Sequence, residues 1–210
     1  MTPTGRFITI EGGEGTGKST LIAGLKDALT SRGLNVLTTR EPGGTPLAEE
    51  VRELALKNRT DGQFSALAMA LLMNTARDDL LERQIRPALR NGFWVFCDRF
   101  SDSTRVYQGI DGVSENFLSA LERSVVADTV PDLTLILDGA PDVLLKRRVS
   151  RGVSDVFEAR DATFHEEVRA RFLQIASDNP ERCAVINAET DPKTLLAASL
   201  VQIKERVGLP

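Results

Sequence analysis

The chain has 210 residues, of which 41% are hydrophobic and 27% are charged, a balance typical of a globular domain with a substantial core. Its 26 basic and 30 acidic residues give a formal net charge of −4, which argues against non-specific binding to nucleic acid, because such binding needs a basic face. No apolar run approaches the ~18 residues of a membrane span, and the N-terminus lacks the apolar core of a signal peptide. We therefore expect a cytoplasmic protein with neither nucleic-acid nor membrane partners.

Short apolar runs alternate with longer helical patterns along the chain. The runs are rich in β-branched or aromatic residues and are mostly followed by turn residues, which predicts buried strands at residues 7–11, 35–40, 93–98, 133–138 and 183–187. Helices are predicted at residues 18–33, 46–58, 64–85, 114–127, 140–151, 162–177 and 192–207. Strands that alternate with helices favour parallel pairing through right-handed crossovers. We therefore predict one α/β domain over residues 1–210, a three-layer α/β/α sandwich around a five-stranded parallel sheet.

The first motif follows the first predicted strand. Residues 12–19, GGEGTGKS, match the pattern G-x-x-x-x-G-K-[ST] of a P-loop NTPase fold. Small residues let backbone N–H groups surround phosphate oxygens, and the helix N-terminus adds the positive end of its dipole. Lys18 can reach the β and γ phosphates, and the Ser19 hydroxyl can ligate Mg²⁺. The nucleotide-binding loop is predicted to comprise Gly12, Gly13, Glu14, Gly15, Thr16, Gly17, Lys18, Ser19 and Thr20.

This loop alone does not separate GTPases, motor ATPases and small-molecule kinases, although no N-K-x-D motif is present to read guanine. A second group of charges narrows the choice. Arg40 ends the second predicted strand, while Asp98 and Arg99 end the third, and the carboxyl ends of parallel strands meet at one edge of the sheet. Asp98 is placed where a carboxylate associated with Mg²⁺ would lie. Two arginines beside a P-loop indicate phosphoryl transfer to an acceptor that itself carries a phosphate.

Several motifs together resemble those of thymidylate kinases. The stretches FITIEGGEGTGKST, TREPGGT, CDRFSDSTRVYQG and PDLTLILD occur in the order and spacing of that family, and the resemblance covers roughly residues 6–187. The resemblance implies transfer of the ATP γ-phosphate to dTMP, giving dTDP and ADP, with Mg²⁺ as the cofactor. It also implies a homodimer formed through helices at 46–57 and 64–89, although apolar helix faces there are equally compatible with an intramolecular core.

The resemblance assigns roles around the sugar and phosphate of dTMP. Glu14 matches an acidic P-loop position whose carboxylate faces the acceptor, near its sugar hydroxyl. This explains an acid among anion-binding amides, where a carboxylate facing ATP would be repelled. Arg40 and Arg99 match residues that hold the acceptor phosphate. Lys18 and Arg99 are therefore the catalytic candidates within this part of the chain.

Further roles concern the base and the deoxyribose. Arg77 matches an arginine that reads the thymine edge. Thr104, Tyr107 and Gln108 lie at i, i+3 and i+4, so they share one face if helical, and the family tyrosine crowds the sugar 2′ position. Met73 stands where the family usually has a phenylalanine stacked on the base. Methionine is apolar and adaptable and can cover a base face.

A lid is predicted at about 147–160, after the fourth strand, where Arg147, Arg148 and Arg151 precede the possible hinge Gly152. A closing lid can supply an arginine that stabilises charge on the transferring phosphoryl group. Family members with an arginine inside the P-loop do not need this, but Gly15 occupies that position here, as in the bacterial type. Arg151 is the first candidate, and Arg147 or Arg148 the second. An amphipathic helix with a solvated basic face is the alternative.

Two other functions stay open on the sequence. Met73 leaves room for a kinase that acts on another, modified deoxynucleoside monophosphate or on a non-nucleotide. A P-loop switch NTPase, which signals by its nucleotide state, predicts slow hydrolysis and no phosphate acceptor, and the arginines at 40 and 99 argue against it.

Overall fold

The computed structural model describes residues 5–61, 64–149 and 162–209. Within them, five strands form one parallel sheet in the order β2-β3-β1-β4-β5. The strands are β1 Arg6–Gly12, β2 Val36–Arg40, β3 Trp94–Asp98, β4 Leu133–Asp138 and β5 Cys183–Asn187. Each predicted strand is confirmed to within one residue at either end.

The register places the predicted charged residues at one edge of the sheet. Asp98 is opposite Arg40 of β2 on one side and opposite Ile10 of β1 on the other. Gly12 pairs with Leu137 of β4, the residue before Asp138. The strand ends therefore finish level with one another, and the loops after them open onto the same side.

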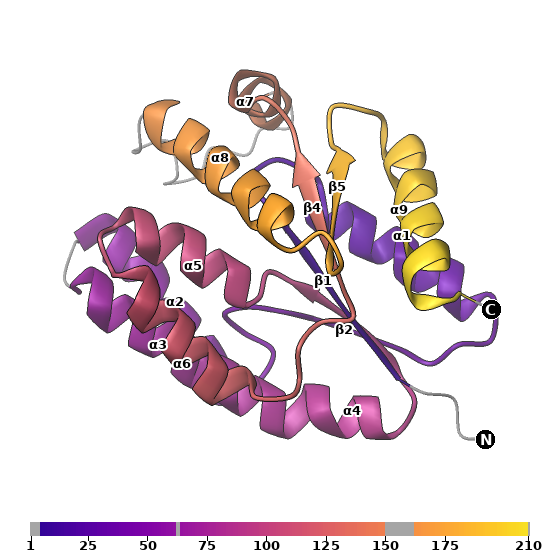
Figure 1. Cartoon of the computed structure of the whole chain (residues 1–210), viewed down its shortest axis with the longest axis horizontal. Coiled ribbons are helices and arrows are strands. Elements are labelled where there is room, and N and C mark those ends of the chain that lie inside the picture. The colour runs from indigo at the N-terminus through magenta and orange to yellow at the C-terminus, as the bar shows by residue number, and fades with distance from the viewer. Residues whose placement is uncertain (1–4, 62–63, 150–161, 210) are drawn as a thin grey trace.

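Helices cover both faces of the sheet, as Figure 1 shows. They are α1 Lys18–Thr30, α2 Pro46–Asp61, α3 Ala66–Leu80, α4 Arg86–Arg90, α5 Ser101–Ile110, α6 Glu115–Val126, α7 Pro141–Val149, α8 Ala162–Asp178 and α9 Pro192–Val207, with a π-helical turn η1 at Leu81–Ile85. No helix in the described ranges combines the length and the apolar character that crossing a membrane demands.

Alternation along β1 divides the core into two layers. Ile8 and Ile10 lie in a buried cluster with Leu25 of α1 and Ile203 of α9. Phe7 points to the opposite face, where its cluster contains residues of α3, η1, β3 and α6 together with Phe100, the residue before α5. In Figure 1, α1 and α9 lie to the right of the strands, and α5 and α8 to the left. The predicted three-layer sandwich is confirmed.

Two helical segments differ from the prediction. The helix expected at 64–85 instead runs through α3, η1 and α4 to Arg90. Pro87 has no N–H for the preceding turn, and the wider π-helical turn lies immediately before it. The second difference is α5, which the apolar periodicity alone did not single out as a helix. Its apolar positions are few, and its buried face carries Asp102, Thr104 and Gln108.

Candidate active site

The glycine loop between β1 and α1 forms the first part of the site. Gly12, Gly15 and Gly17 have φ angles of 127°, 77° and 94°, which only glycine adopts freely. At Gly12 a side chain would also collide with the carbonyl oxygen of Leu137. The loop therefore curls between β1 and α1 in a way that leaves backbone N–H groups available to a phosphate.

Lys18 folds back over this loop. Its Nζ donates hydrogen bonds to the carbonyl oxygens of Gly12, at 3.0 Å, and Gly13, at 2.8 Å. The pKa of Lys18 is lowered to about 7, because burial and the nearby charge of Arg99 outweigh the opposing charges of acids including Asp98 and Glu14. A polyanion in the loop supplies the negative charge that a buried ammonium lacks.

Ser19 and Asp98 meet beside the loop. The Ser19 Oγ, in the first turn of α1, donates a 3.0 Å hydrogen bond to Asp98 Oδ2 at the end of β3. Groups of three or more His, Cys, Asp or Glu side chains that would enclose a metal are absent from the described part of the chain. Two protein oxygens nevertheless suit Mg²⁺, which usually keeps several waters and takes its other ligands from substrate phosphates.

Arg99 follows Asp98 in an unusual backbone conformation. Its φ of 69° lies in the left-handed region, which costs of order 1–3 kcal/mol for a residue other than glycine. The half-buried guanidinium donates through Nη1 to Tyr107 Oη at 3.2 Å, Ser103 Oγ at 3.3 Å and Gly12 O at 3.4 Å. It also lies 5.1 Å from the centre of the Tyr107 ring. Strain of this kind persists only where the surroundings fix it, and it aims the guanidinium at the loop.

Arg40 lies at the rim of the same edge. Its Nη2 donates to both carboxylate oxygens of Glu49 at 3.0 Å, and half of its side chain is exposed. The backbone N–H of Gly44, the Arg40 side chain and the Arg52 charge each lower the pKa of Glu49 despite slight burial. An incoming phosphate therefore competes with Glu49 for Arg40.

Arg52 is a cation that the sequence analysis missed. It projects from α2, and its Nη1 donates to the carbonyl oxygen of Pro42 at 3.1 Å. Burial lowers the pKa of Arg52, and the charges of Arg40 and Arg99 lower it further while Glu49 and Asp98 raise it. Arg52 therefore lies close to the other two arginines. The signal in the sequence was its position three residues after Glu49, on one face of α2.

Arg77 is buried and already paired. Its Nε and Nη2 donate to Glu41 Oε2 at 2.9 and 2.7 Å, Nη1 to Asn74 Oδ1 at 2.9 Å, and Nη2 also to Thr104 Oγ1 at 2.9 Å. The guanidinium carbon lies 5.2 Å from the centre of the Phe100 ring. Four of the five N–H donors of an arginine are thus engaged, and one on Nη1 is left.

Glu41 was also missed by the sequence analysis. Burial raises the pKa of Glu41, while the charge and hydrogen bonds of Arg77 oppose the shift. Within the described ranges, its Oε1 is buried without a hydrogen-bond partner. Because Glu41 directly follows Arg40 in the sequence, the sequence suggests Arg40 as its partner. Only the tertiary structure shows that Glu41 pairs with Arg77.

The remaining residues predicted around the acceptor lie on α3 and α5. Thr104 and Gln108 are buried, and Tyr107 contacts both Arg99 and the rings of Phe164 and Phe172. Met73 is half-buried and packs on the cluster between α2 and α3. The helical spacing at 104, 107 and 108 is thus realised in α5.

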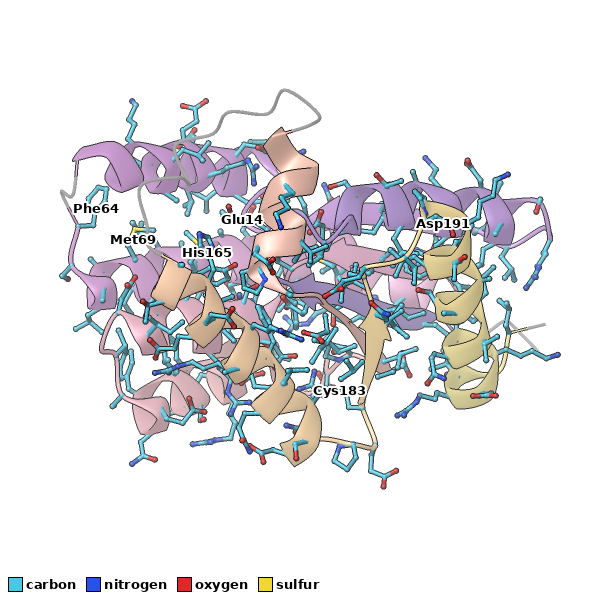
Figure 2. The ribbon with its side chains drawn as sticks, turned by 90° about the horizontal axis from the view of Figure 1, so that it is seen from above. Glu14, Phe64, Met69, His165, Cys183 and Asp191 are labelled. Atoms are coloured by element: carbon cyan, nitrogen blue, oxygen red, sulfur yellow. The ribbon has the colours of Figure 1, made fainter. Side chains whose placement is uncertain are left out.

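A cleft of about 310 Å³ lies between the glycine loop and the start of α9. The loop after β5 and the start of α9 form its far wall. Figure 2 shows Glu14 and Asp191, which lines this cleft, well apart. The lining residues are Gly15, Thr16, Gly17, Thr20, Leu21, Ala188, Thr190, Asp191, Pro192 and Leu195.

The predicted lid falls outside the described residues. Arg151 and the rest of 150–161 are not described, nor are the side chains of Arg147 and Arg148. Among the described residues, the structure brings together Lys18, Ser19, Asp98 and Arg99, with Arg40 and Arg52 next to them. Fold and site together are those of a P-loop phosphotransferase, with a cleft beside the glycine loop and a group of arginines next to Lys18 and Asp98.

Comparisons with known proteins define the family. A model of the thymidylate kinase family matches residues 10–198. The thymidylate kinase of Caulobacter vibrioides is 47% identical over 206 residues, covering 98% of this chain and 99% of that protein. That of Nitrobacter hamburgensis is 45% identical over 207 residues, covering 97% and 90%. The solved structure of the thymidylate kinase from Ehrlichia chaffeensis has a TM-score of 0.78 at 31% identity, covering 96% of this chain and all of that one. The chain belongs to the thymidylate kinase family.

Proposed function

We propose that the chain transfers the γ-phosphate of ATP to dTMP and yields dTDP and ADP. The observation that carries this proposal is that Lys18 and Arg99 both donate hydrogen bonds to the same carbonyl oxygen. Lys18 Nζ donates to the Gly12 carbonyl at 3.0 Å, and Arg99 Nη1 donates to the same oxygen at 3.4 Å. Lys18, which suits the phosphates of ATP, and Arg99, which suits the phosphate of dTMP, therefore point to the same place. The two phosphates would lie end to end there.

The donor occupies the glycine loop and the 310 Å³ cleft beside it. Lys18 and the backbone of the loop hold the phosphates, and the adenosine lies toward the loop after β5. Ser19 and Asp98 are the residues that would hold Mg²⁺, and the ion would neutralise charge on the donor phosphates.

The acceptor lies on the Arg99 side of the loop. Arg99, Arg40 and Arg52 hold its phosphate, and charge-assisted bonds of this kind contribute roughly 1.5–3 kcal/mol each. Glu14 accepts from the sugar hydroxyl. The base and deoxyribose contact Met73, Arg77, Thr104, Tyr107 and Gln108.

The residues act by positioning and by charge. The acceptor phosphate is already ionised, so no side chain has to remove a proton from it. Lys18 and Arg99 stabilise the charge that spreads over the transferred group as the bond to ADP breaks. The N–H that remains on Arg77 Nη1 suits a carbonyl oxygen of a pyrimidine rather than an amino group.

An arginine of the lid completes this charge stabilisation. Arg151→Ala is expected to lower kcat by up to ~10³-fold or more, the effect of removing an arginine finger, while the Kd for ATP changes little. Arg147→Ala and Arg148→Ala test the second candidates, and a larger loss of kcat in either of them would assign the role to that residue instead. If only ATP binding weakens in Arg151→Ala, this residue is a ground-state clamp.

A panel of monophosphates tests the substrate. The wild-type protein is assayed with ATP and dTMP, dUMP, 5-substituted dUMP analogues, dCMP and dGMP, and dTMP is expected to give the highest kcat/KM. The one observation in favour of a modified deoxyuridylate is Met73, which is flexible and half-buried among residues of α2 and α3. A higher kcat/KM for any other monophosphate would replace dTMP as the substrate.

We also propose that the chain forms a cytoplasmic homodimer through α2 and α3. Leu47 and Leu54 of α2 and Leu67 and Leu71 of α3 are 42%, 38%, 48% and 46% exposed, which is unusual for large apolar side chains gathered on two packed helices. Light scattering is expected to give the mass of two chains. The double variant Leu67→Lys with Leu71→Lys should give the mass of one chain, whereas a wild-type monomer would contradict this assembly.

The free thiols of Cys97 and Cys183 suit a reducing compartment.

A further inference from the structure

Glu11 is a buried acid that the assignment above does not use. It lies next to the end of β1, immediately before Gly12, and none of its surface is exposed. Both carboxylate oxygens are bonded. Oε1 accepts the backbone N–H of Phe100 at 2.7 Å, and Oε2 accepts the Ser103 hydroxyl at 2.6 Å.

The first of these bonds fixes the backbone on either side of Arg99. The Arg99 N–H donates to the carbonyl oxygen of Ile10 at 3.0 Å, and the next N–H, that of Phe100, donates to Glu11. Two neighbouring residues of β1 thus hold two neighbouring N–H groups around a residue with a φ of 69°. A left-handed residue with a long side chain needs this kind of restraint to stay in place.

The second bond reaches the Arg99 side chain. Ser103 lies between the two groups, because its Oγ is 2.6 Å from Glu11 Oε2 and 3.3 Å from Arg99 Nη1. The pKa of Glu11 is raised to about 8, because burial and the charge of Asp102 outweigh the opposing effects of Ser103, Arg99 and Phe100. The bond between Glu11 and Ser103 is kept in either protonation state, with its direction reversed when Glu11 is neutral.

We propose that Glu11 is the positioning residue that sets the orientation of Arg99 toward the acceptor phosphate. This inference rests on the proposed function. Glu11 acts on the acceptor side through Arg99, while its charge also raises the pKa of Lys18. Because Gly12 follows Glu11 directly, the same strand end that starts the donor loop also fixes the acceptor arginine. The distance between donor and acceptor is thereby set by one residue of the central strand.

Three variants test this role beside the wild-type protein. Glu11→Ala removes both acceptor oxygens, and we expect the KM for the monophosphate to rise and kcat to fall, together by ~10²-fold in kcat/KM, as for a small misplacement of a catalytic group. The KM for ATP should stay within ~2-fold, since the donor loop keeps its own bonds. Glu11→Gln keeps an oxygen for Phe100 and an amide for Ser103, so it should restore kcat/KM to within ~5-fold of wild type.

Thr134→Val is the matched control for lost buried polarity. Its hydroxyl bonds to Thr9 at 2.7 Å and accepts from Arg182 at 2.7 Å, and Arg99 is not one of its partners. The control is expected to lower Tm and leave both KM values unchanged. If Glu11→Ala is too unstable to assay, Ser103→Ala cuts only the side-chain arm and should raise the KM for the monophosphate by ~3- to 10-fold.

The outcomes separate this role from the proposed function. All variants are assayed with whichever monophosphate the wild-type protein phosphorylates best, so the wild-type choice tests the function and the variants test Glu11. A folded Glu11→Ala protein with an unchanged KM for the monophosphate overturns the proposal. Equal increases in both KM values, or a Glu11→Gln protein as impaired as Glu11→Ala, also overturn it, as does an unchanged KM in Ser103→Ala.

Discussion

Ser19 Oγ donates a hydrogen bond of 3.0 Å to Asp98 Oδ2, which joins the first turn of α1 to the end of β3. These two residues are 79 positions apart in the sequence, yet they present two hard oxygens next to the glycine loop. The contact also brings the donor loop against the strand that carries Arg99. A divalent cation at this point would be held by both segments.

Asp98→Asn tests the cation site. The substitution keeps the shape but removes the negative charge, so kcat should fall by ~10²-fold or more, as for other groups that act on charge in the transition state. The Mg²⁺ concentration for half-maximal rate should rise as well, which a titration of Mg²⁺ at saturating nucleotide measures. Asp128→Asn, at an exposed acid remote from the loop, is the control. An unaltered Mg²⁺ requirement in Asp98→Asn would exclude Asp98 as a ligand.

Lys18 makes donor binding dependent on pH. Its pKa is lowered to about 7, chiefly by burial, so at pH 8 it is largely neutral in the free protein. Phosphates of ATP raise this pKa, and binding at pH 8 therefore takes up close to one proton, whereas binding at pH 6 takes up almost none. Calorimetric titration in buffers of different ionisation enthalpy measures the uptake. Lys18→Met should abolish it, and an unchanged uptake in this variant would assign the proton to another group.

Arg99→Ala tests the acceptor arginine. We expect kcat/KM for dTMP to fall by at least ~10²-fold, because Arg99 meets charge in the transition state. Arg105→Ala is the control, on the helix α5 that follows Arg99. Arg105 pairs with Glu115 of α6 at 2.8 Å, and an exposed pair of this kind contributes only ~0–1 kcal/mol. Steady-state kinetics distinguish the two. Similar values for both variants would remove Arg99 from the reaction.

Two arginine–glutamate pairs of different burial, Arg77–Glu41 and Arg40–Glu49, test how much burial adds to the contribution of such a pair. Glu41→Ala leaves the Arg77 charge unpaired in the core, so the free energy of unfolding should fall by ~3–5 kcal/mol. Glu49→Ala breaks the half-exposed pair with Arg40, and this should cost ~0–1 kcal/mol. Urea denaturation followed by circular dichroism measures both. Equal losses would show that burial does not decide the contribution of the Glu41–Arg77 pair.

The parts of this site that follow from local pattern were predictable from the sequence. The strand ends, the glycine loop and the positions of Ser19, Asp98 and Arg99 depend on short motifs and on the rule that parallel strands end together. Glu11, Glu41 and Arg52 were missed because their roles depend on a distant partner. Glu11 looks like the last residue of an apolar strand, and nothing near it in the sequence points to Phe100 or Ser103.

The same limit applies to the pairing of Arg40. As a strand-end arginine it was predicted to be available to a phosphate, and the structure adds Glu49 as its partner. The π-helical turn at Leu81–Ile85 was not predicted either, since helical periodicity describes the average twist and not a local widening before Pro87.

The strand order β2-β3-β1-β4-β5 bears on how such an enzyme diverges. On the assignment proposed above, the side chains that would meet the monophosphate, Glu14 apart, come from one unbroken stretch between Arg40 and Gln108. The donor nucleoside rests instead on the chain beyond β5. Substitutions confined to the middle of the polypeptide can thus change which monophosphate is accepted and leave the hold on ATP intact, so that one ancestral scaffold can give rise to several kinases that share a phosphate donor.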